Sequence, residues 1–184
     1  LPLDSTEEDL LFYTAKQMKT DVKEIQSIQL VKRSIDARNK QNIHFICTVD
    51  VALNHESVFM KHNKNSKIKY VAPYEYTIPA TKKLETRPIV VGFGPAGMFA
   101  ALILAQAGQN PIVIERGSAV EKRQEQVFSF WYGEKLNPES NVQFGEGGAG
   151  TFSDGKLNTG TKDGRARKVL LELEEAGAPS EILY

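Results

Sequence analysis

One stretch of sequence decides the fold of the second half of this chain: Arg87-Pro88-Ile89-Val90-Val91-Gly92-Phe93-Gly94-Pro95-Ala96-Gly97. The apolar residues predict a short strand, with the proline near its start, where a strand tolerates it. The glycines predict a turn, and the small-residue run 98–107 after them predicts a helix. Pro111–Glu115 is a second apolar strand, so residues 89–115 read as one strand–helix–strand unit.

The glycines follow the pattern GxGxxG, and each has a physical role in binding a dinucleotide. Gly92 permits the tight turn, Gly94 lets backbone approach a pyrophosphate, and Gly97 lets the helix pack closely. The helix begins at Pro95, and its amino terminus offers free N–H groups to phosphates. Glu115, 23 positions after Gly92, stands where an acidic residue accepts from the ribose hydroxyls and repels a 2′-phosphate. The motif leaves NAD and FAD both open, and its candidate binding residues are Gly92, Phe93, Gly94, Pro95, Ala96, Gly97 and Glu115.

The motif also predicts the effect of a substitution at Gly94. A branched side chain there is expected to fill the space of the pyrophosphate and to resist the backbone geometry of the turn.

A second glycine cluster follows about thirty residues after Glu115, within residues 144–151. Successive backbone N–H groups in such a segment form a nest that binds anions, while a plain surface loop is the alternative. The candidate binding residues in this segment are Gly147, Gly148, Ala149, Gly150 and Thr151.

Several segments together resemble a bacterial family labelled NAD(FAD)-utilizing, or FAD-dependent, dehydrogenases. They are Arg33-Ser34-Ile35-Asp36-Ala37-Arg38, the strand 44–51 and the run 142–157. The glycine motif 92–98 together with Val113-Ile114-Glu115-Arg116-Gly117 resembles the FAD-binding opening of the two-dinucleotide-binding-domain flavoproteins. The resemblance implies FAD as cofactor, NAD(P)H as a possible electron donor, and Arg116 as a further cofactor-binding residue. It also implies that the chain is a fragment of a longer flavoprotein with a Rossmann-like FAD domain. The substrate, the catalytic residues and the oligomeric state stay open.

The first half of the chain predicts a small α+β domain. A capping box at Ser5 and Glu8 predicts a helix start, and residues 25–35 and 43–53 predict strands joined by a hairpin loop. With Leu1–Leu3 and residues 67–73 as the first and last strands and 55–62 as a second helix, the order along the chain is that of a ferredoxin-like domain. The expected domains are residues 1–80, a linker over 81–86, and the incomplete FAD-binding region 87–184.

Composition excludes several classes of protein. Of the 184 residues, 41% are hydrophobic, and 23 Lys plus Arg balance 23 Asp plus Glu, which argues against nucleic acid as a partner. Cys47 is the single cysteine, so we expect no disulfide, and the three histidines show no metal-ligand spacing. No apolar run is long enough to span a membrane and no secretory signal is seen, so we expect a cytoplasmic protein.

Other residues have two interpretations each. In the functional interpretation, Arg123 reaches the flavin pyrophosphate and the aromatic residues after it line a substrate or flavin pocket. In the structural interpretation, the same segment is a helix with one solvated face and one packed aromatic face. Ser153, Asp154 and Lys156 are expected near the flavin ring, without an assigned catalytic role. The leading hypothesis is an FAD-dependent oxidoreductase; the alternatives are an NAD-binding dehydrogenase and a flavin-dependent RNA-modifying protein.

Overall fold

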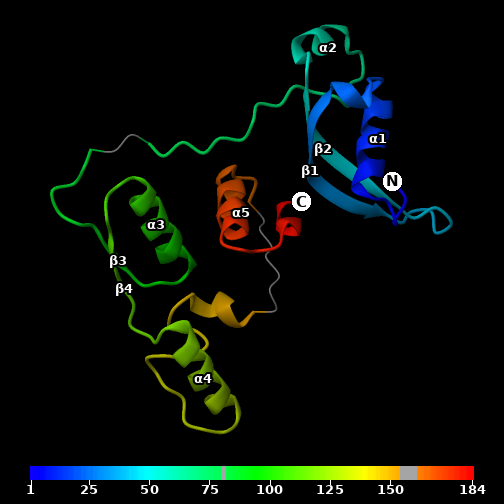
Figure 1. The fold of residues 1–184 in the computed structure, drawn as a ribbon. Coiled ribbons are helices and arrows are strands. Elements are labelled where there is room, and N and C mark those ends of the chain that lie inside the picture. Colours follow the sequence, from blue (N-terminus) through cyan, green and yellow to red (C-terminus); the bar gives the residue numbers. More distant parts are fainter. Residues whose placement is uncertain (80–81, 154–160) are drawn as a thin grey trace. The chain divides into compact units, whose positions relative to one another are not determined.

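The computed structural model describes residues 1–79, 82–153 and 161–184, which form five α-helices and two small sheets (Figure 1). This is a mixed α/β structure. The chain divides into two compact units, residues 1–75 with 167–184 and residues 76–166, and each is described by itself. The expected linker 81–86 lies within the second unit, and its residue 81 is outside the described residues.

The first unit is built around an antiparallel hairpin. Helix α1 (Glu7–Met18) leads through a short 3₁₀ turn (Val22–Glu24) into β1 (Ile25–Asp36), which pairs with β2 (His44–Leu53), and α2 (Glu56–His62) follows. Helix α1 lies alongside the two strands (Figure 1). The two strands, their hairpin loop and both helices confirm the sequence prediction for residues 7–62.

Strand β2 alternates between two environments. Phe45, Cys47, Val49 and Val51 are half-buried, whereas Ile46, Thr48 and Asp50 are exposed. Successive side chains of a strand point to opposite faces, so this pattern gives the hairpin one inward apolar face. The register shifts between Ile25 and Ser27 and again between Leu30 and Lys32, which marks two irregularities in β1.

The cap of α1 lies one residue later than the sequence predicts. Thr6 is the N-cap: its hydroxyl accepts from the Asp9 amide at 3.2 Å, and the Asp9 carboxylate accepts from the Thr6 amide at 2.9 Å. The Ser5 hydroxyl instead donates to the carbonyl of Pro2 at 2.8 Å. Both pairs have capping-box spacing, and the engagement of Ser5 in the preceding turn leaves the role to Thr6.

The predicted strand at residues 67–73 is wrong, because these residues have no regular structure. A strand needs a neighbour for its N–H and C=O groups, and alternating side chains do not supply one. Leu1 has such a neighbour: it exchanges both backbone hydrogen bonds with Phe45, at 2.7 and 2.8 Å, although it is not part of a strand. The first unit therefore contains the second and third strands and both helices of the expected chain order.

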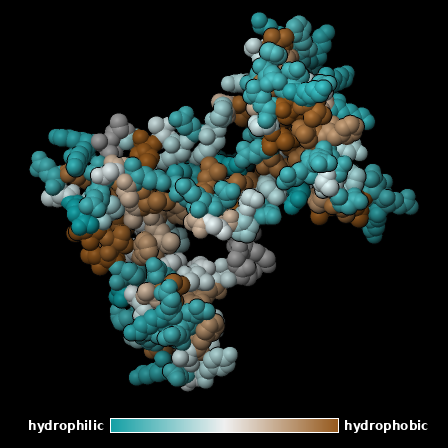
Figure 2. Space-filling model, viewed as in Figure 1, coloured by the Kyte–Doolittle hydropathy of each residue, from teal (hydrophilic) through white to brown (hydrophobic). Residues whose placement is uncertain are grey.

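The second unit contains a strand–helix–strand arrangement. Strands β3 (Ile89–Val91) and β4 (Ile112–Ile114) are parallel neighbours, and α3 (Pro95–Gln106) connects them. The side chains of Ile89 and Val91 are 61% and 83% exposed. Hydrophobic residues gather at the surface of this region (Figure 2).

Helix α4 (Val120–Trp131) and a 3₁₀ turn, η2 (Gly148–Phe152), complete the second unit. Helix α5 (Arg165–Glu175) begins in the second unit and continues in the first, where a short 3₁₀ turn, η3 (Ser180–Leu183), follows it. No helix in the described ranges is long and apolar enough to cross a membrane.

Candidate functional site

The first glycine turn lies where the two parallel strands end. The Gly92 amide donates to the carbonyl of Ile114 at 2.7 Å, which continues the ladder one residue past β3. The chain then turns into α3, whose N-cap is Gly94 and whose first residue is Pro95. Because the carboxyl ends of parallel strands share one edge, this turn lies beside the end of β4.

Gly97 packs against the turn so closely that no side chain fits. A Cβ at this position would stand 2.0 Å from the carbonyl oxygen of Gly92 and 2.9 Å from its carbon. A backbone obstacle cannot swing aside as a side chain can, so the close approach of α3 to the end of β3 requires glycine here.

Gly94 differs from Gly97. Its φ of −77° and ψ of −178° are extended and open to any residue, and the nearest atom to an added Cβ would be the Gly148 Cα at 3.8 Å. The expectation that a side chain at position 94 resists the turn's backbone is therefore wrong. Neither the backbone nor the space within the described protein requires glycine at this position.

Glu115 ties the first turn to the end of β4. Its carboxylate accepts from the Phe93 amide at 2.6 Å and from the Gly117 amide at 2.8 Å. These bonds, that from Gly117 foremost, hold the pKa of the Glu115 carboxyl below its usual value. A carboxylate has about four lone-pair sites, so this geometry leaves acceptor capacity for ribose hydroxyls.

The second glycine segment meets the first at Phe93. The Gly147 amide donates to the carbonyl of Phe93 at 2.9 Å. A Cβ on Gly148 would approach Pro95 Cδ at 3.1 Å and Gly94 Cα at 3.2 Å. The structure thus brings together two segments that lie about fifty residues apart in the sequence, and backbone lines the place where they meet.

The rest of the second segment forms the turn η2. Ala149, Gly150 and Thr151 are exposed. The Thr151 hydroxyl donates to the Glu146 carbonyl at 3.2 Å, which closes the segment on itself. The Glu146 carboxylate accepts from the Val120 amide at 2.8 Å, at the first residue of α4; nothing in the sequence pattern marked that contact.

Arg116 contacts the loop that precedes the second glycine segment. Its Nε lies 3.1 Å from a carboxylate oxygen of Glu139, and its guanidinium stands 4.7 Å from the centre of the Phe144 ring. Both ion-pair side chains are 59% exposed, so the pair contributes little to stability. The contacts place Arg116 at the outer side of the loop that leads to residues 144–151.

Arg123 is fully buried, and its guanidinium donates to the loop around Gly145. The aromatic residues that follow it on α4 are largely exposed: Phe128 and Trp131 contact edge to face at 5.6 Å, and Trp131 meets Phe152 of η2 at 6.2 Å. Of the two interpretations of this segment, the packed aromatic face is therefore wrong for α4, whose buried residues are Arg123 and Val127. Ser153 follows η2 and is exposed, whereas Asp154 and Lys156 lie outside the described residues.

Comparison with known proteins adds two findings. Residues 1–52 match the model of a family described as Domain of unknown function (DUF8436). An uncharacterized protein of Clostridium beijerinckii is 48% identical over 171 residues, which are 92% of this chain and 32% of that protein. An alignment of that length extends over both glycine segments, and this chain spans about a third of the relative's length.

Proposed function

We propose that the two glycine segments bind FAD and that the chain is part of an FAD-dependent oxidoreductase. The observation that carries the proposal is Gly94. This position has ordinary extended backbone and room for a Cβ, yet it carries none, and it faces Gly148 of the second segment. Gly148 needs glycine for its positive φ and its close approach to Pro95, whereas a pyrophosphate bound against backbone is a reason for glycine at position 94 that the protein's own packing does not supply.

The surrounding residues suit the two halves of the cofactor. The amino terminus of α3, with Pro95 as its first residue, directs N–H groups and the positive end of the helix dipole toward phosphates. Glu115 stands at the end of β4, where its remaining lone pairs can accept from the ribose. The Gly147 and Gly148 amides are already bonded to the carbonyls of Phe93 and Gly145. The second segment therefore lines the other side with backbone that carries no side chain at Gly148, in line with the resemblance to FAD-dependent dehydrogenases.

FAD, when bound, supplies hydride chemistry, and the protein binds, orients and electrostatically tunes it. The described residues named here all serve binding, and none is proposed as catalytic. NADH or NADPH is the proposed electron donor of the whole protein.

A pair of glycine variants tests the proposal. We expect Gly94→Ala to lower FAD affinity about tenfold or more, because the methyl group occupies space that the pyrophosphate needs. Folding stability should fall by at most about 1 kcal/mol, since Ala is a poorer N-cap than Gly. The matched control is Gly164→Ala, at a position where an added Cβ meets no atom within 4 Å and φ is not positive.

FAD and NAD⁺ would be titrated separately into the wild-type chain and both variants. Equal FAD affinity in wild type and Gly94→Ala would contradict the proposed site. Binding of NAD⁺ without FAD would retain a dinucleotide site and overturn the flavoprotein assignment.

A further inference from the structure

Arg123 is the one charged side chain that is buried among the described residues, with 0% of its surface exposed. It projects from the first turn of α4. Its Nε donates to the carbonyl of Asn141 at 2.9 Å, and its Nη2 donates to the carbonyl of Val142 at 2.9 Å. Its Nη1 donates to the carbonyl of Glu146 and to the Thr151 hydroxyl.

Among the described residues, no carboxylate pairs directly with this guanidinium. Burial lowers the pKa of Arg123, and the nearby charge of Glu115 opposes that shift. An arginine stays protonated in proteins, so a full positive charge is held here by neutral oxygens and by the Phe152 ring, 4.9 Å from the guanidinium carbon. Burying a charge is costly unless its hydrogen bonds are made, and here four of its five N–H groups are used.

The loop is wrapped around this side chain. Gly145 has a φ of 122°, and a Cβ on it would stand 2.6 Å from the Arg123 Cδ. The backbone acceptors of Arg123 lie on both sides of Gly145, at Asn141, Val142 and Glu146. Two residues after Gly145, the amide of Gly147 reaches the first turn.

We propose that Arg123 is a positioning residue: it holds the second glycine segment against the first, so that the site for the pyrophosphate is assembled before the cofactor binds. This rests on the proposed function. Arg123 does not itself contact the cofactor, because its donors face the loop carbonyls. The planar fork is essential, since a lysine ammonium is a point charge and cannot reach four acceptors arranged around a guanidinium.

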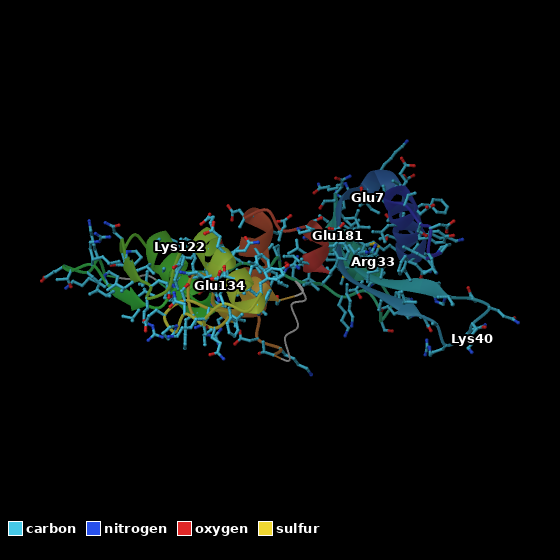
Figure 3. All side chains as sticks on the ribbon, turned by 90° about the horizontal axis from the view of Figure 1, so that it is seen from below. Glu7, Arg33, Lys40, Lys122, Glu134 and Glu181 are labelled. Carbon is cyan, nitrogen blue, oxygen red and sulfur yellow. The ribbon has the colours of Figure 1, made fainter. Side chains whose placement is uncertain are left out.

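The test uses Arg123→Lys with Lys122→Gln as its matched control, because Lys122 is the adjacent residue of α4 and is exposed (Figure 3). Dissociation constants for FAD and for AMP would be measured on the same 184-residue chain. We expect Arg123→Lys to lower the affinity for FAD about tenfold or more and to leave the affinity for AMP unchanged, because the first turn and Glu115 bind the adenosine half of the cofactor. Amide hydrogen exchange should accelerate in residues 145–152 and stay unchanged in α3.

Thr151→Val is a milder second variant that removes one acceptor of Arg123, and we expect it to weaken FAD by a few fold. Unchanged FAD affinity in Arg123→Lys would overturn the proposal. Unchanged amide hydrogen exchange in residues 145–152 of this variant would contradict the preassembly of the site by Arg123. Loss of AMP and FAD together would assign Arg123 to the fold of the whole unit instead. A wild-type chain that binds no FAD would refute the proposed function rather than this role of Arg123.

Discussion

Replacing Glu115 with alanine is expected both to destabilise the first glycine turn and to lower the affinity for FAD. The carboxylate accepts from the amides of Phe93 and Gly117, at 2.6 and 2.8 Å. Hydrogen bonds to charged groups contribute about 1.5–3 kcal/mol each. Because Glu115 is only half-buried, water can replace part of the lost hydrogen bonding. We therefore expect the free energy of unfolding to fall by about 1–3 kcal/mol in total.

The matched variant is Glu115→Gln, which keeps the shape and one acceptor oxygen and turns an NH₂ group toward the other amide. Its loss should be about half that of Glu115→Ala. For the cofactor, loss of the ribose acceptor should raise the FAD dissociation constant by about 5- to 150-fold in Glu115→Ala, which corresponds to about 1–3 kcal/mol.

Urea unfolding, amide hydrogen exchange and FAD titration of the three proteins would measure these effects. The exchange of the Phe93 and Gly117 amides should accelerate in Glu115→Ala, because each loses its acceptor. Unchanged exchange at both amides would refute the assigned structural role of Glu115. Faster exchange with unchanged FAD affinity would leave that role intact and show that the ribose is bound elsewhere.

Three further predictions concern the elements around the site and the first unit. Gly97→Ala should destabilise the second unit by about 1–3 kcal/mol in urea unfolding, because its Cβ would overlap the Gly92 carbonyl at 2.0 Å; wild-type stability would contradict that close approach. The amide shift of Phe93 should titrate with a midpoint below pH 4.5, because the pKa of Glu115 is lowered. The stabilisation from this carboxylate is therefore complete above pH 4.5 and is lost as the pH falls through the folded-state pKa. A midpoint at or above pH 4.5 in an NMR titration would show that the hydrogen bonds are absent. Thr6→Ala should cost about 1 kcal/mol of stability through loss of the α1 N-cap, and a smaller loss than in Ser5→Ala would show that the cap lies at Ser5.

The strand–helix–strand unit was predictable because its signals are local. Apolar runs, the glycine turn and the helix that begins at Pro95 lie within residues 89–115, and each specifies its own conformation. The same holds for the hairpin of β1 and β2. Helix α5 was missed, although Val169, Leu170 and Leu173 have helical spacing that could have revealed it.

The wrap of the loop around Arg123 could not be predicted, because it depends on contacts between residues 18 to 28 positions apart. A charged residue on a helix is ordinarily solvated, and nothing local distinguishes Arg123 from Lys122. The strand expected at residues 67–73 was wrong for the related reason that pairing partners are a tertiary property. Gly94 shows the opposite case: the motif predicted a backbone reason for glycine there, and the structure shows ordinary extended backbone with room for a Cβ.

Binding of FAD by the two glycine segments together can be measured by mapping the amide shifts of the labelled 184-residue chain as FAD is added. We expect shifts concentrated in residues 92–97 and 145–151 and at Glu115, saturating with one dissociation constant. Shifts confined to other parts of the chain, or none at all at millimolar FAD, would contradict the proposed site.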